Sequence, residues 1–177
     1  SVFVPYDILQ DETASKALVS GQSDKAGVTA GVSGAWVADS AYKVTAEDEN
    51  STLVSATKMN VYGGMRMGGK NYYGLDMLIP TAPKILFKIT GGLGGFSRMG
   101  QTWSKPVLAN IRYNKKITRV MIVGGGYDMC YENPTFALNK KNSNTDYPDT
   151  ACDNKPEAQG NAIYIVNADT GDLIWWA

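Results

Sequence analysis

The sequence predicts an all-β fold, a β-propeller of four-stranded antiparallel blades, to which this chain supplies about two blades plus an N-terminal segment. Two observations lead to this prediction. The 177 residues include 19 glycines, ten tyrosines and four tryptophans, spread among many short apolar runs. That mixture suits short strands joined by tight turns. The apolar runs also recur in the same order, which indicates a repeated four-strand unit.

The first blade repeat spans residues 34–89. Its four expected strands cover residues 35–44, 56–62, 71–77 and 84–89. The acidic loop 47–50 interrupts the first pair, and Gly63 and Gly64 close the second strand. Glycine tolerates positive φ and close backbone approach, which a crowded blade requires.

The second blade repeat spans residues 102–177, and the polar insert 128–160 enlarges it. Its expected strands cover residues 103–110, 117–126, 161–167 and 172–176. In this alignment Trp103 corresponds to Trp36. The glycine-rich stretch 91–95 between the repeats is interpreted as a flexible connection.

The segment before the first blade starts extended, at residues 2–5. A short helix is expected over residues 11–18, with Asp11 or Thr13 as its N-cap. No signal peptide is visible at the N-terminus, and we expect the chain to be an internal piece of a longer protein rather than a processed precursor.

One blade has two apolar faces and must stack against others to bury them. A propeller needs at least four blades, so the sequence predicts that the chain is part of one β-propeller domain completed by residues outside it. An ordinary β-sandwich with accidental internal similarity is the alternative.

Composition excludes several function classes. Lys plus Arg and Asp plus Glu both number 17, so no strong field attracts nucleic acid or an anionic membrane. No apolar run is long enough for a transmembrane segment. With no histidine, most His-based nucleophiles and zinc sites are excluded. Gly124-Gly125-Gly126 lacks the following Lys-Ser/Thr helix of a phosphate-binding loop.

The two cysteines, Cys130 and Cys152, bracket most of the polar insert. A disulfide between them would tie down a long polar segment and would stabilise it by roughly 3 kcal/mol. It would also imply an oxidising compartment. Two unrelated reduced thiols are the alternative.

Four motifs in order resemble a known family. Residues 162–175 (AIYIVNADTGDLIW) resemble the blade repeat of quinoprotein-dehydrogenase-like propellers, in which a strand enters an Asp-x-x-Thr-Gly turn. Residues 63–76 (GGMRMGGKNYYGLD), 102–107 (TWSKPV) and 122–128 (IVGGGYD) are similar to segments of the PilC/PilY family. The resemblance extends over nearly the whole chain.

The resemblance implies the C-terminal propeller of a type IV pilus tip protein, exported through the periplasm and outer membrane to the cell surface. Such proteins act in pilus extension and retraction and in adhesion to host cells or surfaces, with minor pilins, the rest of the propeller and a receptor as partners. No enzyme activity and no quinone are expected. The alternatives are a quinoprotein dehydrogenase, for which Asp76, Asp128 and Trp103 supply the residue types, and an outer-membrane scaffold propeller.

The resemblance also implies calcium, bound by an Asp-rich loop that we expect outside this chain. Within the chain, the nearest candidate ligands are Asn142, Asn144, Asp146 and Asp149, and the acidic run 47–50 is weaker still. The first stretch lacks the glycine that such loops use for their bend. A solvated loop is the simpler interpretation of both.

Aromatic residues of the insert are candidates for a binding surface. Tyr131 and Tyr147 lie within it and Tyr127 precedes it. Loops on a rigid scaffold commonly carry binding, and Tyr suits recognition surfaces. We expect the insert to be a contact surface, with simple loop packing as the alternative.

Overall fold

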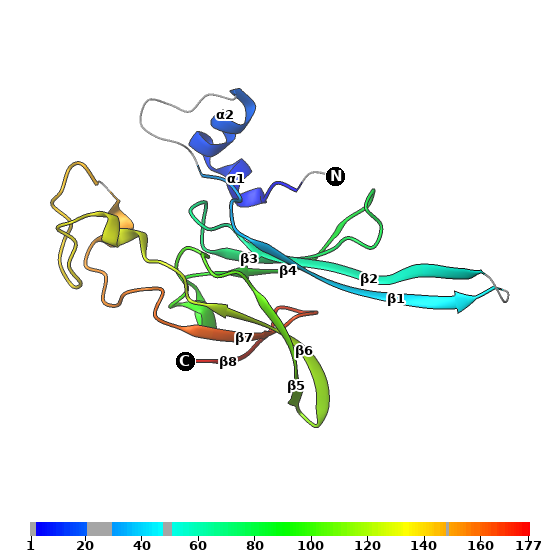
Figure 1. Cartoon of the computed structure of the whole chain (residues 1–177). Helices are drawn as coiled ribbons and strands as arrows, with labels where there is room; N and C mark the ends of the chain where they lie inside the picture. Colours follow the sequence, from blue (N-terminus) through cyan, green and yellow to red (C-terminus); the bar gives the residue numbers. More distant parts are fainter. Residues whose placement is uncertain (1–2, 21–29, 48–50, 148) are drawn as a thin grey trace.

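The structure is a computed structural model that describes residues 3–20, 30–47, 51–147 and 149–177. In these residues eight strands form two four-stranded antiparallel sheets, with strand orders β1-β2-β3-β4 and β5-β6-β7-β8 (Figure 1). Each strand pairs with its neighbours in sequence. The predicted all-β fold with two four-stranded antiparallel blades is therefore confirmed.

The first sheet contains β1 (Trp36–Ala46), β2 (Thr52–Gly64), β3 (Asn71–Asp76) and β4 (Lys84–Thr90). β2 pairs with β3 only over its last five residues, from Asn60 to Gly64. The outer parts of β1 and β2, residues 42–46 and 52–56, therefore form a two-stranded arm that extends beyond the sheet (Figure 1).

The second sheet contains β5 (Val107–Tyr113), β6 (Lys116–Gly124), β7 (Ile163–Asn167) and β8 (Leu173–Trp176). Asn114 and Lys115, with φ of 49° and 64°, form the two-residue turn between β5 and β6. Two successive positive φ values are typical of the hairpin turn that matches strand twist. The insert lies between β6 and β7.

The two sheets repeat each other residue by residue. The β3–β4 register shifts between Gly74 and Leu75, and the β7–β8 register shifts between Ile165 and Val166. When the two sheets are aligned at these shifts, each paired position in one sheet has an equivalent position in the other. Two neighbouring rows of residues paired across the four strands are called here the A row and the B row of each sheet. The A rows are Val37, Tyr62, Gly74 and Phe87 in the first sheet and Val107, Ile122, Ile165 and Trp175 in the second. The B rows are Ala38, Val61, Leu75 and Ile85 in the first sheet and Leu108, Met121, Val166 and Leu173 in the second.

The main core lies between the A row of the first sheet and the B row of the second. Tyr62 and Phe87 belong to the same buried cluster as Met121 and Val166. The A face of one sheet therefore packs on the B face of the other. In a sandwich with two-fold symmetry, the two sheets would pack through the same face. Repetition of one contact in one direction is how adjacent propeller blades stack.

A second, smaller core covers the other face of the first sheet. The helices α1 (Tyr6–Gln10) and α2 (Glu12–Ser20) place Ile8 and Ala14 against Met65, Tyr73 and Leu75. Figure 1 shows both helices on the side of the first sheet away from the second. Within the described part of the chain, no helix has the length and apolar character needed to span a bilayer.

The N-terminal segment differs in part from the prediction. Asp11, rather than Thr13, caps α2, because its Oδ1 accepts the Ala14 N–H at 2.8 Å. α1 was not predicted. Pro5 has the extended backbone that was expected, with φ of −57° and ψ of 136°, and it directly precedes this helix as its N-cap residue. A proline with its fixed φ is compatible with a helix start as well as with an extended strand.

The expected strand 103–110 starts too early. β5 begins at Val107, and the register equivalence places Pro106, not Trp103, opposite the position of Trp36. Pro106 has no N–H for a ladder bond, which explains why the strand begins after it. The short 3₁₀ turn η1 (Gly94–Phe96) begins within the connection at residues 91–95.

Candidate functional site

The segments that carry the sequence motifs meet in one region of the molecule. They are residues 64–71 between β2 and β3, residues 100–104 before β5, and residues 125–128 after β6. We call this region the motif junction. Main-chain hydrogen bonds link all three segments, so the junction depends on backbone geometry as well as on side-chain contacts.

Thr102 is the centre of the motif junction, and it is 1% exposed. Its Oγ1 accepts the Met65 N–H at 2.8 Å and lies 3.1 Å from the Asn71 carbonyl oxygen, to which it can donate. Its backbone pairs in the same region, since Arg66 N–H donates to the Thr102 carbonyl and Thr102 N–H donates to the Gly69 carbonyl. One side chain thereby satisfies backbone groups from both ends of the 64–71 loop.

Gln101 joins the third motif to the other two. Its N–H donates to the Tyr127 carbonyl at 2.7 Å, and the Tyr127 N–H donates back at 3.0 Å. Gly126, with φ of 87°, lies so close to the Gln101 carbonyl that an added Cβ would collide with it. The glycine of this motif is therefore required for the close approach of two backbones.

The motif tyrosine Tyr72 adds a side-chain contact to the junction. Its hydroxyl donates to the Ser104 carbonyl at 2.8 Å. Burial raises the pKa of Tyr72 above its usual value. The hydroxyl therefore keeps its proton and remains a donor throughout the physiological pH range.

An exposed aromatic and cationic group lies on the outside of the junction. The Arg66 guanidinium lies 4.3 Å from the centre of the Trp103 ring, and Tyr127 meets that ring edge-on at 6.4 Å. Trp103 is 40% exposed. Stacking on Arg66 holds the indole in place at the surface.

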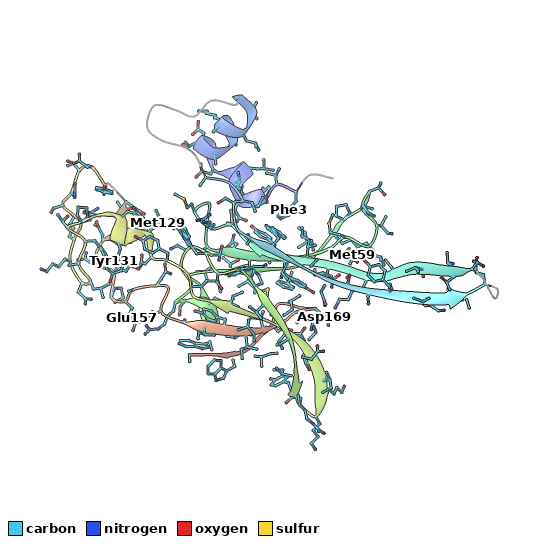
Figure 2. All side chains as sticks on the ribbon, viewed as in Figure 1. Phe3, Met59, Met129, Tyr131, Glu157 and Asp169 are labelled. Atoms are coloured by element: carbon cyan, nitrogen blue, oxygen red, sulfur yellow. A yellow bond between two sulfur atoms is a disulfide. The ribbon has the colours of Figure 1, made fainter. Side chains whose placement is uncertain are left out.

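The insert begins directly after the motif junction and is closed by the Cys130–Cys152 disulfide. The two Cα atoms are 5.6 Å apart, and both cysteines are buried. They lie in the 3₁₀ turns η2 (Met129–Glu132) and η3 (Thr150–Cys152). The disulfide expected from the sequence is present. In Figure 2, the labelled residues Met129 and Tyr131 lie on the opposite side of the molecule from the arm.

A buried ion pair lies next to the disulfide. Lys155 Nζ lies 2.7 Å from both carboxylate oxygens of Asp128, and the two side chains are 13% and 1% exposed. The N–H groups of Cys130 and Gln159 also donate to this carboxylate. Burial alone would raise the pKa of Asp128, but Lys155 and the two backbone donors outweigh it and hold the pKa below its ordinary value.

Lys70 connects the 64–71 loop to the insert. Its Nζ donates to Gln159 Oε1 at 2.8 Å, and Lys155 Nζ approaches the same oxygen at 3.5 Å. Burial, followed by the positive charge of Lys155, lowers the pKa of Lys70. The basic position of the glycine-rich motif therefore has a structural partner in the insert.

The four candidate calcium ligands serve as turn-forming residues. The Oδ1 atoms of Asn142, Asn144 and Asp149 accept backbone N–H groups two residues ahead, at 2.8 to 3.0 Å. Asp146 contributes its own N–H to one of these turns. In the described part of the chain, no three Asp, Glu or Cys side chains are grouped so that they could hold a metal ion. The Oδ1 atoms of Asn142, Asn144 and Asp149 are thus engaged in turn hydrogen bonds, and most of the run 47–50 lies outside the described residues.

The candidate binding tyrosines of the insert are exposed. Tyr131 is 51% exposed and meets Phe136 edge-on at 5.0 Å, and Tyr147 is 41% exposed. Tyr147 borders a cavity of about 390 Å³ that is also lined by the two cysteines and Glu132. Tyr127, which precedes the insert, is less exposed (half-buried) and belongs to the motif junction rather than to the surface of the insert.

The three residues that supply the residue types of a dehydrogenase (Asp76, Asp128 and Trp103) each make a separate structural contact. Asp76 accepts the Leu78 N–H at 2.9 Å in the turn after β3, and Asp128 is the ion-pair partner of Lys155. Trp103 is stacked with Arg66. Each of these side chains therefore has a contact that accounts for its position without a cofactor.

Sequence reasoning missed three residues of this region. Lys155 and Gln159 lie in an irregular polar stretch with no periodicity, so their partners could not be assigned from spacing. Arg66 lies in a motif, but its stacking depends on a positive φ of 59°, which is uncommon for a non-glycine residue. The glycine pairs on either side of it, Gly63-Gly64 and Gly68-Gly69, each come to within two residues of it and are the local signal of an unusual turn.

Comparisons with known proteins gave limited results. No family model matches the chain, and no curated protein matches it. Among solved structures, it is similar to the crystal structure of the Pseudomonas aeruginosa PilY1 C-terminal domain, with 20% sequence identity and a TM-score of 0.46. The similarity covers 80% of this chain and 21% of that structure's chain.

Proposed function

We propose that this chain is part of the propeller module of a type IV pilus tip-associated protein, acting in pilus extension and retraction and in adhesion to host cells or surfaces. The observation that supports this most is the junction of the three glycine- and aromatic-rich motifs. Among the residues on which the resemblance to the PilC/PilY family rests, Thr102 and Gly126 make specific contacts in the junction, and Lys70 joins its 64–71 loop to the insert. When the residues that carry a resemblance lie together and serve one structural role, chance explains the resemblance less easily than when they lie at unrelated positions.

The proposed role is non-enzymatic and extracellular. Its partners would be the pilus tip with its minor pilins and a receptor on a host cell or surface, and not nucleic acid. The buried disulfide suits a protein that passes through an oxidising compartment. Calcium, which the resemblance implies, would be held by a loop outside this chain, and no quinone is expected.

The insert is the proposed contact surface for adhesion. It presents Tyr131 and Tyr147, both substantially exposed, on a loop whose ends are joined by a disulfide and a buried ion pair. A preorganised loop loses less conformational entropy on binding than a mobile one. Rigid exposed tyrosines are typical of recognition surfaces.

The test is made in the bacterium that carries the gene. In-frame removal of this chain is expected to reduce the number of surface pili, counted by electron microscopy, and to reduce adherence. Replacing residues 132–150 with a short linker, with both cysteines kept, is expected to lower adherence while pili still form. A Glu157→Gln variant, changed at an exposed insert position, serves as the matched control.

Normal piliation and adherence after removal of the chain would overturn the proposal. Loss of adherence in the control variant would show that the insert assay reports general damage rather than binding. An absorbance band of a bound quinone in the near ultraviolet, in the purified protein, would favour the dehydrogenase instead.

A further inference from the structure

The charges of the chain are unevenly distributed along the sequence, although they sum to zero. Between Asp76 and Asp128 there is no Asp or Glu, whereas eight residues are Lys or Arg. Lys88, Arg98 and Arg119 of this stretch form ion pairs with carboxylates that lie outside it. The fold decides where the other cations of the stretch are presented.

Three of these other cations lie together at the end of the β5–β6 hairpin. They are Arg112, Lys115 and Lys116, and we call residues 112–117 the hairpin tip. All three are exposed, and none of them pairs with a carboxylate in the part of the chain that the structure describes. The hairpin tip is therefore a small surface of uncompensated positive charge.

The hairpin tip projects beyond the four-stranded part of the second sheet. β6 pairs with β7 only from Val120 to Gly124, whereas it continues to pair with β5 as far as Lys116. In Figure 1 the turn of this hairpin lies at the lower end of the molecule, away from the other segments. Propeller blades stack through the faces of their four-stranded sheets, so stacking does not require the hairpin tip to be covered.

Apolar side chains accompany the cations at the hairpin tip. Ile117, 73% exposed, is paired with Arg112, and Tyr113, 40% exposed, is paired with Lys116. Directly paired residues lie on the same face of a hairpin, so each face of the tip presents one cation and one apolar side chain. A two-residue turn joins the strands next to these pairs, so the arrangement is part of a regular hairpin and not of a long loop.

This combination of side chains indicates the class of partner. Cations alone would bind any polyanion, but an exposed isoleucine gains little from a hydrated polysaccharide or a phosphate backbone. At the surface of a lipid bilayer both kinds of side chain find partners, because apolar groups enter the headgroup layer while Lys and Arg reach the phosphates. Tyrosine is enriched at the same boundary.

We propose that the hairpin tip binds the surface of an anionic lipid bilayer. Ile117 and Tyr113 enter the headgroup layer, and Arg112, Lys115 and Lys116 contact lipid phosphates. Each Lys or Arg near an anionic bilayer strengthens binding about fivefold, so the three together contribute roughly 100-fold. The zero net charge of the chain does not oppose this local contact, because charges at physiological ionic strength act over only about 8 Å. The inference goes beyond the proposed function, which assigns adhesion to the insert.

Co-sedimentation of the purified 177-residue chain with lipid vesicles tests the proposal. The chain is expected to bind vesicles of phosphatidylcholine and phosphatidylglycerol in equal parts, to bind pure phosphatidylcholine vesicles far less, and to dissociate as salt is raised. The double variant Lys115→Gln, Lys116→Gln is expected to bind the mixed vesicles about 25-fold more weakly. The matched control is Lys140→Gln, Lys141→Gln, which removes the same charge from two neighbouring exposed lysines of the insert. This control is expected to bind like the unchanged chain.

A variant with the same charge separates a bilayer from other polyanions. Ile117→Gln is expected to weaken binding to the mixed vesicles roughly threefold to tenfold, because a polar side chain gains less from the headgroup layer. Its binding to immobilised heparin, a sulfated polysaccharide, is expected to be no weaker than that of the unchanged chain.

Circular dichroism establishes that each variant is folded. A chain that binds neither kind of vesicle, or both kinds equally, overturns the proposal. An equal loss in the two double variants overturns it, and so does an Ile117→Gln variant that binds the mixed vesicles like the unchanged chain. Binding to heparin but not to vesicles would assign the hairpin tip to a polysaccharide and would overturn the lipid surface as its partner. Adherence through the insert is measured separately in the bacterium, so neither result decides the other.

Discussion

At the scale of single residues, the Thr102 hydroxyl joins backbone groups from both ends of the 64–71 loop. Thr102→Val keeps the side-chain shape but leaves the buried Met65 N–H without its 2.8 Å acceptor. An unsatisfied buried group costs about 1–3 kcal/mol, so we expect the free energy of unfolding in urea to fall by that amount. Thr45→Val, at an exposed position of β1, should change it by less than about 0.5 kcal/mol. Equal values for the two variants would contradict the role of Thr102.

A second prediction at the scale of single residues concerns Asp128. Asp128→Asn leaves the Lys155 ammonium, only 13% exposed, without a counter-charge. Breaking a buried ion pair costs about 3–5 kcal/mol, and we expect a loss of that order in thermal or urea unfolding. Glu157→Gln breaks the more exposed pair with Arg98 and should cost about 0–1 kcal/mol. Similar losses in both variants would argue against a special role for the buried pair.

The pH dependence of the same pair follows from the lowered pKa of Asp128. A carboxyl whose pKa is lower in the folded than in the unfolded state stabilises the fold fully above its unfolded pKa of about 3.9. This contribution is lost as the pH falls through the folded pKa. The difference in unfolding free energy between the unchanged chain and Asp128→Asn should therefore be constant near neutral pH and shrink below about pH 4. A difference that persists unchanged in acid would contradict this.

At the scale of elements, the insert depends on its disulfide. It contains two short 3₁₀ turns and no strand among its described residues, so the disulfide and the Asp128–Lys155 pair are the main contacts that join its two ends. Replacing both Cys130 and Cys152 with serine should cost roughly 3 kcal/mol and expose residues between them to protease. Mass spectrometry of the cleaved fragments locates the effect. Reduced but otherwise unchanged protein should behave in the same way, and a protease pattern unaffected by either treatment would contradict the prediction.

The eight strands could be predicted in outline because each contains a short apolar run bounded by glycine, proline or polar turns, but β2 starts at Thr52, before the expected residue 56, because the arm continues the pairing of β1 and β2. The errors came where local sequence supports two structures. Pro5 is extended as expected but also suits the start of a helix, so α1 was missed, and Pro106, three residues after Trp103, delays the start of β5. In the candidate site, the disulfide was predictable from two isolated cysteines. The Asp128–Lys155 pair was not, because its partners are 27 residues apart across an irregular insert.

At the scale of the whole molecule, one charged cluster joins the two sheets outside the apolar core. Arg119 of β6 donates to Asp39 of β1 through Nη2 at 2.8 Å and Nε at 3.3 Å, and Lys58 of β2 lies 2.9 Å from the same carboxylate. Burial opposes the charged form of Asp39, but these two cations hold its pKa below the ordinary value. The contact links the first and second blades directly.

Asp39→Asn is therefore expected to weaken the packing of one sheet on the other. Hydrogen bonds to charged groups contribute about 1.5–3 kcal/mol, and urea unfolding should show a loss of that order. Lys58→Gln leaves the two bonds from Arg119 in place and should cost less. If Lys58→Gln costs as much as Asp39→Asn, the bridge between the sheets is not the source of the effect.

The repeat of the two sheets could be inferred from sequence only in outline. Order and number of strands recur visibly, but the residue-by-residue equivalence rests on the register shifts at Leu75 and Val166, which leave no trace in the sequence pattern. The direction of stacking, A row on B row, follows from that equivalence. It could be recognised only once the paired strands were known.

The same register shifts also affect the outer edges of the two sheets. In β4 the extra residue is Leu86 and in β8 it is Ile174, and neither is paired with the neighbouring strand. An unpaired residue interrupts the regular spacing of N–H and C=O groups that another strand would need in order to add on. The chain is thereby protected at these two edges against the strand-by-strand polymerisation that produces amyloid, although it is rich in β-structure and has large exposed apolar side chains.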